Sequence, residues 1–253
     1  MSRRVYYRLL RNWGRALSQL LPRPAFIYLP RYFRDWWLFS RTGREAPLRD
    51  THPCLTDHIS HTPFDPHYFY QAAWLARRLA ANIPEKHVDI GSDIRMINVL
   101  SAFVPTEFLD YRPLQVNLSG LVCGSGNLVA LLRADESIRS LSCLHVVEHI
   151  GLGRYGDPLD PEGSNKALSE LQRVLAPNGQ LYLSLPVGRE RVCFNAHRVF
   201  EPQTIITAMS SLRLLEFSLV DDAGAFHESV SPGMAAGLEY GCGLFVFEKP
   251  DAE

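Results

Sequence analysis

The sequence predicts an α/β fold in which a mostly parallel sheet is covered by helices on both faces. Two observations support this prediction. From residue 86 onward, short apolar segments of strand length alternate with segments of helical periodicity, which is the pattern of a parallel sheet with crossover helices. The composition is that of a globular protein, with 46% hydrophobic and 21% charged residues. No apolar run approaches the roughly 18–20 residues that span a bilayer.

Seven strands and four helices are predicted in order along the chain. The strands are expected at residues 86–92, 107–110, 117–122, 142–147, 180–185, 214–220 and 244–248. The helices are expected at residues 67–82, 94–103, 164–175 and 204–211. Ligands of such sheets bind beyond the carboxyl ends of the strands. The residues that follow the first four strands are therefore the candidates for a functional site.

Charge and composition divide the chain into three parts. They are a basic N-terminal extension at residues 1–44, a loop and helix at residues 45–84, and the α/β domain at residues 85–253. The extension holds ten Arg, no Lys and one acid, Asp35, and therefore carries +9, whereas the rest of the chain carries −10. Such an asymmetry bears on the partners of a protein rather than on its fold.

The extension has the pattern of a helix that lies on a membrane surface. Residues 3–21 place apolar side chains at helical spacing, and residues 26–39 combine aromatic residues with Arg31 and Arg34. Arginines can meet anionic phosphates while aromatic rings lie at the acyl boundary, so an anionic membrane is the expected partner. Packing on the chain's own body or on a second subunit, nucleic-acid binding and organelle targeting remain as alternatives.

The cysteines bear on the compartment. Their number is odd, they are scattered, and they form no CxxC pair: Cys54, Cys123, Cys143, Cys193 and Cys242. This pattern gives no sign of a disulfide framework or of a zinc site, and it predicts a reducing, cytoplasmic environment. With a membrane-binding extension, the protein is expected at the inner face of a membrane.

Polar residues follow each of the first four predicted strands. Gly91 stands at the first strand-to-helix turn, where a glycine lets a ligand approach the backbone. Asp110 follows the second strand and can accept hydrogen bonds from both ribose hydroxyls of a nucleoside. Asn127 follows the third strand and can hold an adenine edge, and His145 and His149 belong to the end of the fourth. The GxGxxG pattern is absent, which argues against a NAD enzyme.

Residues 85–250 resemble the class I S-adenosylmethionine-dependent methyltransferases. The resemblance is carried by the VDIG string at residues 88–91, by the EHI string at 148–150, and by ELQRVLAPNG with LYLSLP at 170–186. Three longer strings, at residues 62–71, 145–157 and 195–200, look like a methyltransferase-like family known only as a domain of unknown function.

The sequence departs from the broad methyltransferase pattern in two places. Gly91 is followed by Ser92 and Asp93 where most of these enzymes carry further glycines. Asn127 stands where an Asp is usual.

The resemblance implies a Rossmann-like three-layer fold with a seven-stranded sheet whose last strand is antiparallel. It also implies S-adenosyl-L-methionine as cofactor, with these residues as its ligands: Asp89, Gly91, Ser92, Asp110, Tyr111, Asn127 and His145. The expected activity is O-methylation of a small molecule or a glycan near a membrane. The alternative is a non-catalytic protein that keeps the fold for binding or scaffolding.

For O-methylation, a general base is expected near the acceptor hydroxyl. His149 is the first candidate because histidine titrates near neutrality, and His197 and Asp157 are the others. The acceptor is expected between residues 154–157 and 195–197. No metal is expected, because the acids around Asp157 alternate with prolines as in a solvated loop. No nucleic-acid acceptor is expected either, since the body is acidic and lacks an amine-methylating motif. The oligomeric state is left open.

Overall fold

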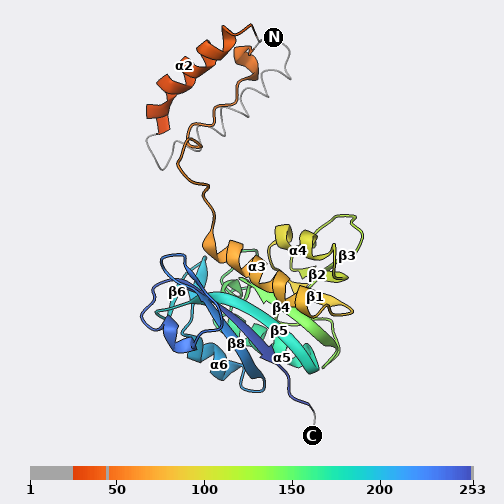
Figure 1. The fold of residues 1–253 in the computed structure, drawn as a ribbon. Helices are drawn as coiled ribbons and strands as arrows, with labels where there is room; N and C mark the ends of the chain where they lie inside the picture. Colours follow the sequence, from red (N-terminus) through yellow and green to blue (C-terminus); the bar gives the residue numbers. More distant parts are fainter. Residues whose placement is uncertain (1–24, 44–45, 252–253) are drawn as a thin grey trace. The chain divides into compact units, whose positions relative to one another are not determined.

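The computed structural model describes residues 25–43 and 46–251. The chain forms two compact units, and the boundary between them falls between Pro63 and Phe64 in the sequence (Figure 1). The described part of the first unit contains helix α2 (Leu29–Ser40), between the 3-10 turns Ala25–Tyr28 and Leu48–Asp50. The helix predicted at residues 3–21 lies outside the described residues.

The second unit contains the remaining helices and all the strands of the described residues. Its helices are α3 (Pro66–Ala81), α4 (Ile94–Leu100), α5 (Gly163–Val174) and α6 (Pro202–Ala208). The strands of its large sheet are β1 (His87–Ile90), β2 (Thr106–Asp110), β3 (Leu121–Ser125), β4 (Ile138–Leu144), β5 (Leu175–Val187), β8 (Arg213–Val220), β9 (Phe226–His227) and β10 (Gly241–Glu248). A hairpin, β6 (Arg191–Cys193) with β7 (His197–Val199), and the 3-10 turns Val147–His149 and Pro232–Ala235 complete it.

The large sheet confirms the predicted topology. Its strand order is β3-β2-β1-β4-β5-β10-β8-β9, and the pairs from β3 to β5 are parallel. The last strand, β10, lies between β5 and β8 and is antiparallel to both. Two small elements were not predicted: β9, a two-residue strand that makes the sheet eight-stranded, and the separate β6–β7 hairpin.

A hydrophobic cluster lies on each face of the sheet, between the sheet and the helices that cover it. Alternate residues of a strand point to opposite faces, and β10 illustrates this. Phe245 and Phe247 join the cluster that contains the buried faces of α5 and α6, whereas Leu244 and Val246 join the one beneath α3 and α4. Each such side chain contributes about 1.5–3 kcal/mol when it is fully buried. The burial of both faces therefore fixes the sheet as the central layer.

Several strand boundaries differ from the prediction, and for two of them the structure shows the cause. The third strand was expected at residues 117–122, but β3 runs from Leu121 to Ser125. It is an edge strand, and Val122 is 64% exposed. Because this strand is not buried on one face, its sequence shows no alternation of apolar and polar residues. The fourth strand was expected to reach Val147 but ends at Leu144, because His145 takes a positive φ of 56° that turns the chain out of the strand.

Two helices of the second unit, α3 and α4, begin at an aspartate that caps them. Asp65 accepts hydrogen bonds from the backbone N–H groups of His67 and Tyr68 at the start of α3, and Asp93 caps α4 through the N–H of Arg95. Among the residues that the structure describes, no helix combines the length and the apolar character needed to cross a membrane.

Candidate functional site

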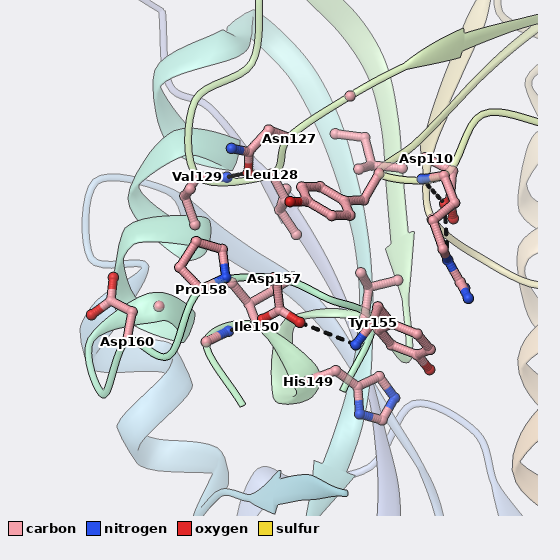
Figure 2. Close-up of a pocket in the computed structure, with 18 of the residues that line it drawn as sticks. Asp110, Asn127, Leu128, Val129, His149, Ile150, Tyr155, Asp157, Pro158 and Asp160 are labelled. Carbon is pink, nitrogen blue, oxygen red and sulfur yellow. Dashed lines mark hydrogen bonds and ion pairs between the residues drawn. The ribbon is translucent and has the colours of Figure 1, made fainter. Parts of the chain in front are cut away.

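A cavity opens at the carboxyl ends of β1 to β4. It is lined by residues that follow all four strands and by the loop at residues 149–160, and Figure 2 shows Asp110, Asn127 and His149 around this space. Of the predicted site residues, the following line it: Gly91, Asp110, Tyr111, Asn127, His145, His149 and Asp157. The parallel topology brings these side chains together because it places successive strand ends at one edge of the sheet.

Gly91 makes the turn from β1 into α4 with a positive φ of 70°. A Cβ atom at this position would lie 3.1 Å from Val146 Cγ1 and 3.8 Å from Asp110 Oδ2. Glycine is therefore required both for the backbone conformation and for the close approach to Val146. The absent side chain keeps the space between the first two strand ends open.

Asp110 ends β2 and faces the cavity. Its Oδ1 accepts a hydrogen bond of 2.6 Å from the backbone N–H of Arg112, which fixes the orientation of the carboxylate. Its backbone carbonyl accepts the N–H of Gly126 at 3.0 Å, and this bond ties the end of β2 to the turn after β3. The neighbouring Tyr111 also lines the cavity and is 46% exposed.

Asn127 follows β3 at the opposite side of the cavity (Figure 2). Its Oδ1 accepts a hydrogen bond of 3.2 Å from the N–H of Val129. The side-chain amide N–H₂ remains as a donor beside the apolar wall that Leu128 and Val129 provide. A planar heterocycle with hydrogen-bond acceptors at its edge would suit this combination.

Asp89 and Ser92 do not line the cavity, although both were predicted as cofactor ligands. Asp89 is fully buried and accepts hydrogen bonds from the N–H and hydroxyl of Ser92 and from the hydroxyl of Ser142. Ser92 in turn accepts the N–H of Leu144 at 3.0 Å. These bonds join the end of β1 to β4, so both residues hold the strand ends in position. Burial raises the pKa of Asp89 to about 6, although the hydrogen bonds from Ser142 and Ser92 act in the opposite direction and lower it.

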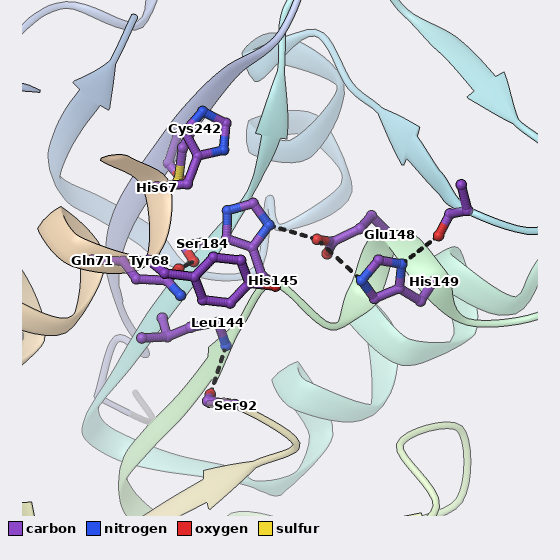
Figure 3. A network of polar contacts seen from close by, with 12 residues as sticks. His67, Tyr68, Gln71, Ser92, Leu144, His145, Glu148, His149, Ser184 and Cys242 are labelled. Atoms are coloured by element: carbon purple, nitrogen blue, oxygen red, sulfur yellow. Dashed lines mark hydrogen bonds and ion pairs between the residues drawn. The ribbon is translucent and has the colours of Figure 1, made fainter. Parts of the chain in front are cut away.

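His145 forms a buried ion pair with Glu148. Its Nδ1 lies 2.7 Å from Glu148 Oε1 (Figure 3), and both side chains are almost fully buried. Burial by itself lowers the pKa of His145, but the Cys242 sulfur and the Glu148 carboxylate raise it to about 10. Burial likewise raises the pKa of Glu148, and His145 brings it below its usual value. The ring of His145 forms part of the cavity wall, and its Nδ1 is turned to Glu148.

His149 lies one turn further on, at the end of the 3-10 turn. Its Nδ1 is 2.6 Å from the backbone carbonyl of Ala196, so this nitrogen carries the proton and Nε2 keeps a lone pair. Nε2 is 3.7 Å from Glu148 Oε1. Burial lowers the pKa of His149, and the Glu148 carboxylate opposes this only in part. His149 is therefore neutral at pH 7 and able to accept a proton.

The loop at residues 150–161 forms the other wall of the cavity, and its own hydrogen bonds order it. Asp157 accepts the N–H of Gly151 at 2.8 Å and that of Tyr155 at 3.2 Å, so both of its oxygens bind the loop backbone. The buried Arg198 donates to the carbonyls of Ile150 and Pro161. Asp157 thus shapes the wall of the site.

The structure brings the two predicted acceptor-binding segments together. Arg154 donates to the carbonyl of Ala196 at 3.1 Å, and the amide of Asn195 donates to the carbonyl of Leu152 at 3.4 Å. His197, the other predicted catalytic residue, belongs to β7, packs 5.0 Å from the Tyr240 ring and does not line the cavity.

Several contacts of the site were not predicted from the sequence, although Tyr155 itself belongs to the predicted segment 154–157. Tyr155 lies between two guanidinium groups, with Arg112 4.4 Å and Arg154 5.1 Å from its ring centroid. Glu148 connects His145 to His149. The pairing of Arg112 with Tyr155 depends on the approach of two loops, which no local pattern indicates. The acid between two histidines in the string HVVEH was a usable signal for Glu148.

Comparison with known protein families gives one match over part of the chain. The model of the family described as "Caenorhabditis protein of unknown function, DUF268" matches residues 134–219, which is less than half of the chain. No curated protein sequence matches the chain.

Solved structures with a similar fold include several methyltransferases. The N-methyltransferase NodS from Bradyrhizobium japonicum WM9, solved with S-adenosyl-L-homocysteine, has a TM-score of 0.53 at 17% identity, covering 80% of this chain and 93% of its own. A protein of Bacillus halodurans C-125 described as a methyltransferase has a TM-score of 0.50 at 15% identity, covering 71% and 99%. The 4+2 cyclase SpnF has a TM-score of 0.51 at 10% identity, covering 72% and 82%.

At these identities the likeness concerns the fold. The strand order of this sheet, with an antiparallel strand between β5 and β8, does not depend on the strings on which the sequence resemblance rests. The cyclase among the similar structures illustrates that one fold supports different chemistries. The chain therefore has the Rossmann-like fold of the class I S-adenosylmethionine-dependent methyltransferases.

Proposed function

We propose that this protein is an S-adenosylmethionine-dependent methyltransferase that acts on a hydroxyl group of a small molecule or glycan. One observation carries the proposal: Gly91, Asp110 and Asn127 follow three successive strands of a methyltransferase fold and line one cavity. Each supplies a feature that an adenosine-containing cofactor needs, namely an open turn, a carboxylate and an amide.

The residues present fit this cofactor. Asp110 would accept hydrogen bonds from the ribose hydroxyls, and the Asn127 amide with Leu128 would hold the adenine. Ser92 and Asp93, which replace the usual glycines, do not narrow the groove. Ser92 turns inward to Asp89, and Asp93 caps α4. The glycine-poor loop is thus compatible with cofactor binding.

The cofactor supplies a methyl group on a sulfonium, so the protein contributes alignment, exclusion of water and a base. His149 Nε2 has the lone pair that can accept the proton of an acceptor hydroxyl. The Glu148 carboxylate 3.7 Å away would stabilise the resulting imidazolium. His149 is preferred over Asp157 as the base because both oxygens of Asp157 already accept backbone hydrogen bonds.

The acceptor side of the cavity favours a polar compound. Tyr155 lines it, and the Arg154 guanidinium stands 5.1 Å from the Tyr155 ring centroid and also reaches the carbonyl that orients His149. A guanidinium and an aromatic face suit a sugar or an anionic polyhydroxyl compound. We assign the acceptor to this chemical class.

Helix α2 supports the proposal of an anionic membrane as the second partner. Trp37, Leu38 and Phe39 are each 51% exposed, and within the described residues α2 has no buried side chain. Arg34 lies on the same helix and Arg41 caps its C-terminus, where the Arg41 guanidinium stands 4.6 Å from the Trp37 ring centroid. Exposed aromatic residues beside arginines match the headgroup region of an anionic bilayer.

The direct test has two stages. Calorimetric titration with S-adenosyl-L-methionine measures binding, and methyl-labelled cofactor with nucleotide sugars and lipid-linked glycans measures transfer. We expect micromolar binding and label transfer to at least one hydroxyl-bearing acceptor. An absence of cofactor binding by the folded protein would refute the proposal. Binding without transfer to any acceptor would support the alternative of a non-catalytic binding protein.

A further inference from the structure

We propose that His67, His145 and Cys242 form a binding site for a divalent transition-metal ion, with Zn²⁺ as the ion that suits these ligands best. The three residues come from α3, from the turn after β4 and from β10, and the sheet brings them to one place. This site shares Glu148 and the ring of His145 with the cavity described above, but the argument for it does not use methyl transfer.

The geometry supplies three ligand atoms of the right kind. One ligand atom from each residue, an imidazole nitrogen from each histidine and the Cys242 sulfur, lies within 4.8 Å of the other two. Two imidazoles and a thiolate are a ligand set of zinc sites. Metal–ligand bonds of about 2.0–2.3 Å place tetrahedral ligands about 3.5 Å apart, so metal binding requires the three atoms to close by about an ångström.

A buried and unpaired nitrogen supports the assignment independently. His145 is 8% exposed, and its Nε2 has no hydrogen-bond partner among the described residues. Figure 3 shows its ring between Glu148 on one side and His67 with Cys242 on the other. A buried nitrogen without a partner costs about 1–3 kcal/mol. A metal ion bound to this lone pair would remove that cost.

The other nitrogen of His145 has the partner that metal-binding histidines have. Its Nδ1 donates to Glu148 Oε1 at 2.7 Å, so Nε2 is the atom that can release its proton and bind a metal ion. Metal-ligating histidines almost always donate their second N–H to a carboxylate, a carbonyl or a water, which fixes the ring and raises its basicity. Glu148 is therefore the orienting residue of the proposed site.

The local charge also suits a divalent cation. A metal ion that displaces the thiol proton makes Cys242 a thiolate beside the Glu148 carboxylate, and both side chains are fully buried. Buried charges are tolerated when they are paired or bind a metal. His67 is fixed near the start of α3 because its backbone N–H donates to the capping Asp65. Three protein ligands leave one position for water or a substrate oxygen, as in catalytic zinc sites.

The experiment uses the full chain freed of metal by a chelator. Equilibrium dialysis against Zn²⁺ with elemental analysis gives the stoichiometry, and titration with Co²⁺ reports thiolate ligation through a near-ultraviolet charge-transfer band. We expect one Zn²⁺ per chain and a thiolate–cobalt band. Cys242→Ser should abolish the band and weaken Zn²⁺ binding more than the 10–100-fold that changes to outer partners cause. His67→Ala, a change at a half-buried position, should weaken binding without loss of the fold.

Two matched cysteine variants keep the test specific. Cys143 is fully buried in β4 like Cys242 but is not part of the cluster, so Cys143→Ser should keep the metal and the band. Cys54 lies in an exposed stretch with His52 and His58. Loss of the band in Cys54→Ser but not in Cys242→Ser would refute the site. So would the absence of stoichiometric binding by the native chain, or an unchanged Zn²⁺ affinity in His67→Ala.

Discussion

Glu148 Oε1 lies 2.7 Å from His145 Nδ1, and the fold encloses this ion pair completely at the carboxyl end of β4. The pair orders the residues behind the cavity, because Glu148 also lies 3.7 Å from His149 Nε2. Breaking a buried pair by removing one partner leaves an uncompensated charge, which costs about 3–5 kcal/mol.

Replacement of Glu148 by Gln should therefore lower the free energy of unfolding of the metal-free protein by about 3–5 kcal/mol. The effect should depend on pH. Because the pKa of His145 is raised from 6.5 to about 10, its stabilising contribution is complete below pH 6.5 and is lost as the pH rises through 10. Urea unfolding of native protein and variant between pH 6 and 10 should give curves that converge at high pH.

Glu239→Gln is the control for this prediction. Glu239 pairs with Arg189 at the surface, where both side chains are more than 60% exposed. Its removal should change stability far less than removal of the buried Glu148, because exposed ion pairs contribute little. An equal loss of unfolding free energy in both variants would contradict the assignment of the buried pair. So would a difference in unfolding free energy between native protein and Glu148→Gln that does not vary with pH.

Asp110→Ala should weaken binding of S-adenosyl-L-methionine by about 1.5–3 kcal/mol, the worth of a hydrogen bond to a charged group. Ser92→Ala provides a contrast, because Ser92 hydrogen-bonds Asp89 and Leu144 behind the cavity. It should lower stability by about 1–3 kcal/mol while cofactor affinity changes by less than 1 kcal/mol. Calorimetric titration and thermal unfolding separate the two effects. A folded Asp110→Ala variant with native affinity would exclude Asp110 as a ribose ligand.

His149→Ala should abolish methyl transfer while cofactor affinity stays within about 1 kcal/mol, since a base acts on the transition state. Burial lowers the pKa of His149 below 6.5, so the native rate should be constant near pH 7 and fall at acidic pH as the ring is protonated. Single-turnover rates with labelled cofactor measure both effects. His197→Ala should keep transfer, because His197 lies outside the cavity. Full activity of His149→Ala would remove it from the mechanism.

Removal of residues 1–44 should abolish binding to anionic vesicles and leave the α/β domain folded. The hydrophobic clusters of the sheet are built from residues of the second unit together with the helices that cover it. Vesicle co-sedimentation and circular dichroism of a chain that begins at Glu45 measure the two properties. Unfolding or aggregation of the shortened chain would show instead that the extension stabilises the body.

The sequence by itself predicted the parts of the fold that depend on local periodicity. The apolar runs of β1, β5 and β8 and the helical spacing of α3 and α5 identify these elements, because the strands are largely buried on both faces and each helix buries one face. Gly91 and Asp110 could be proposed as site residues because parallel strands end at one edge of the sheet. The edge strand β3 was misplaced because its exposure leaves no pattern to detect.

Only the tertiary structure decided which polar residues face the cavity. Asp89 and Ser92 stand at a strand end as Asp110 does, but the hydroxyl of Ser142 on the neighbouring strand draws the Asp89 carboxylate into the interior. The grouping of His67, His145 and Cys242 is likewise invisible in the sequence, since they come from three distant segments. Periodicity encodes which face of an element is buried, whereas the meeting of side chains from separate elements depends on how the layers pack.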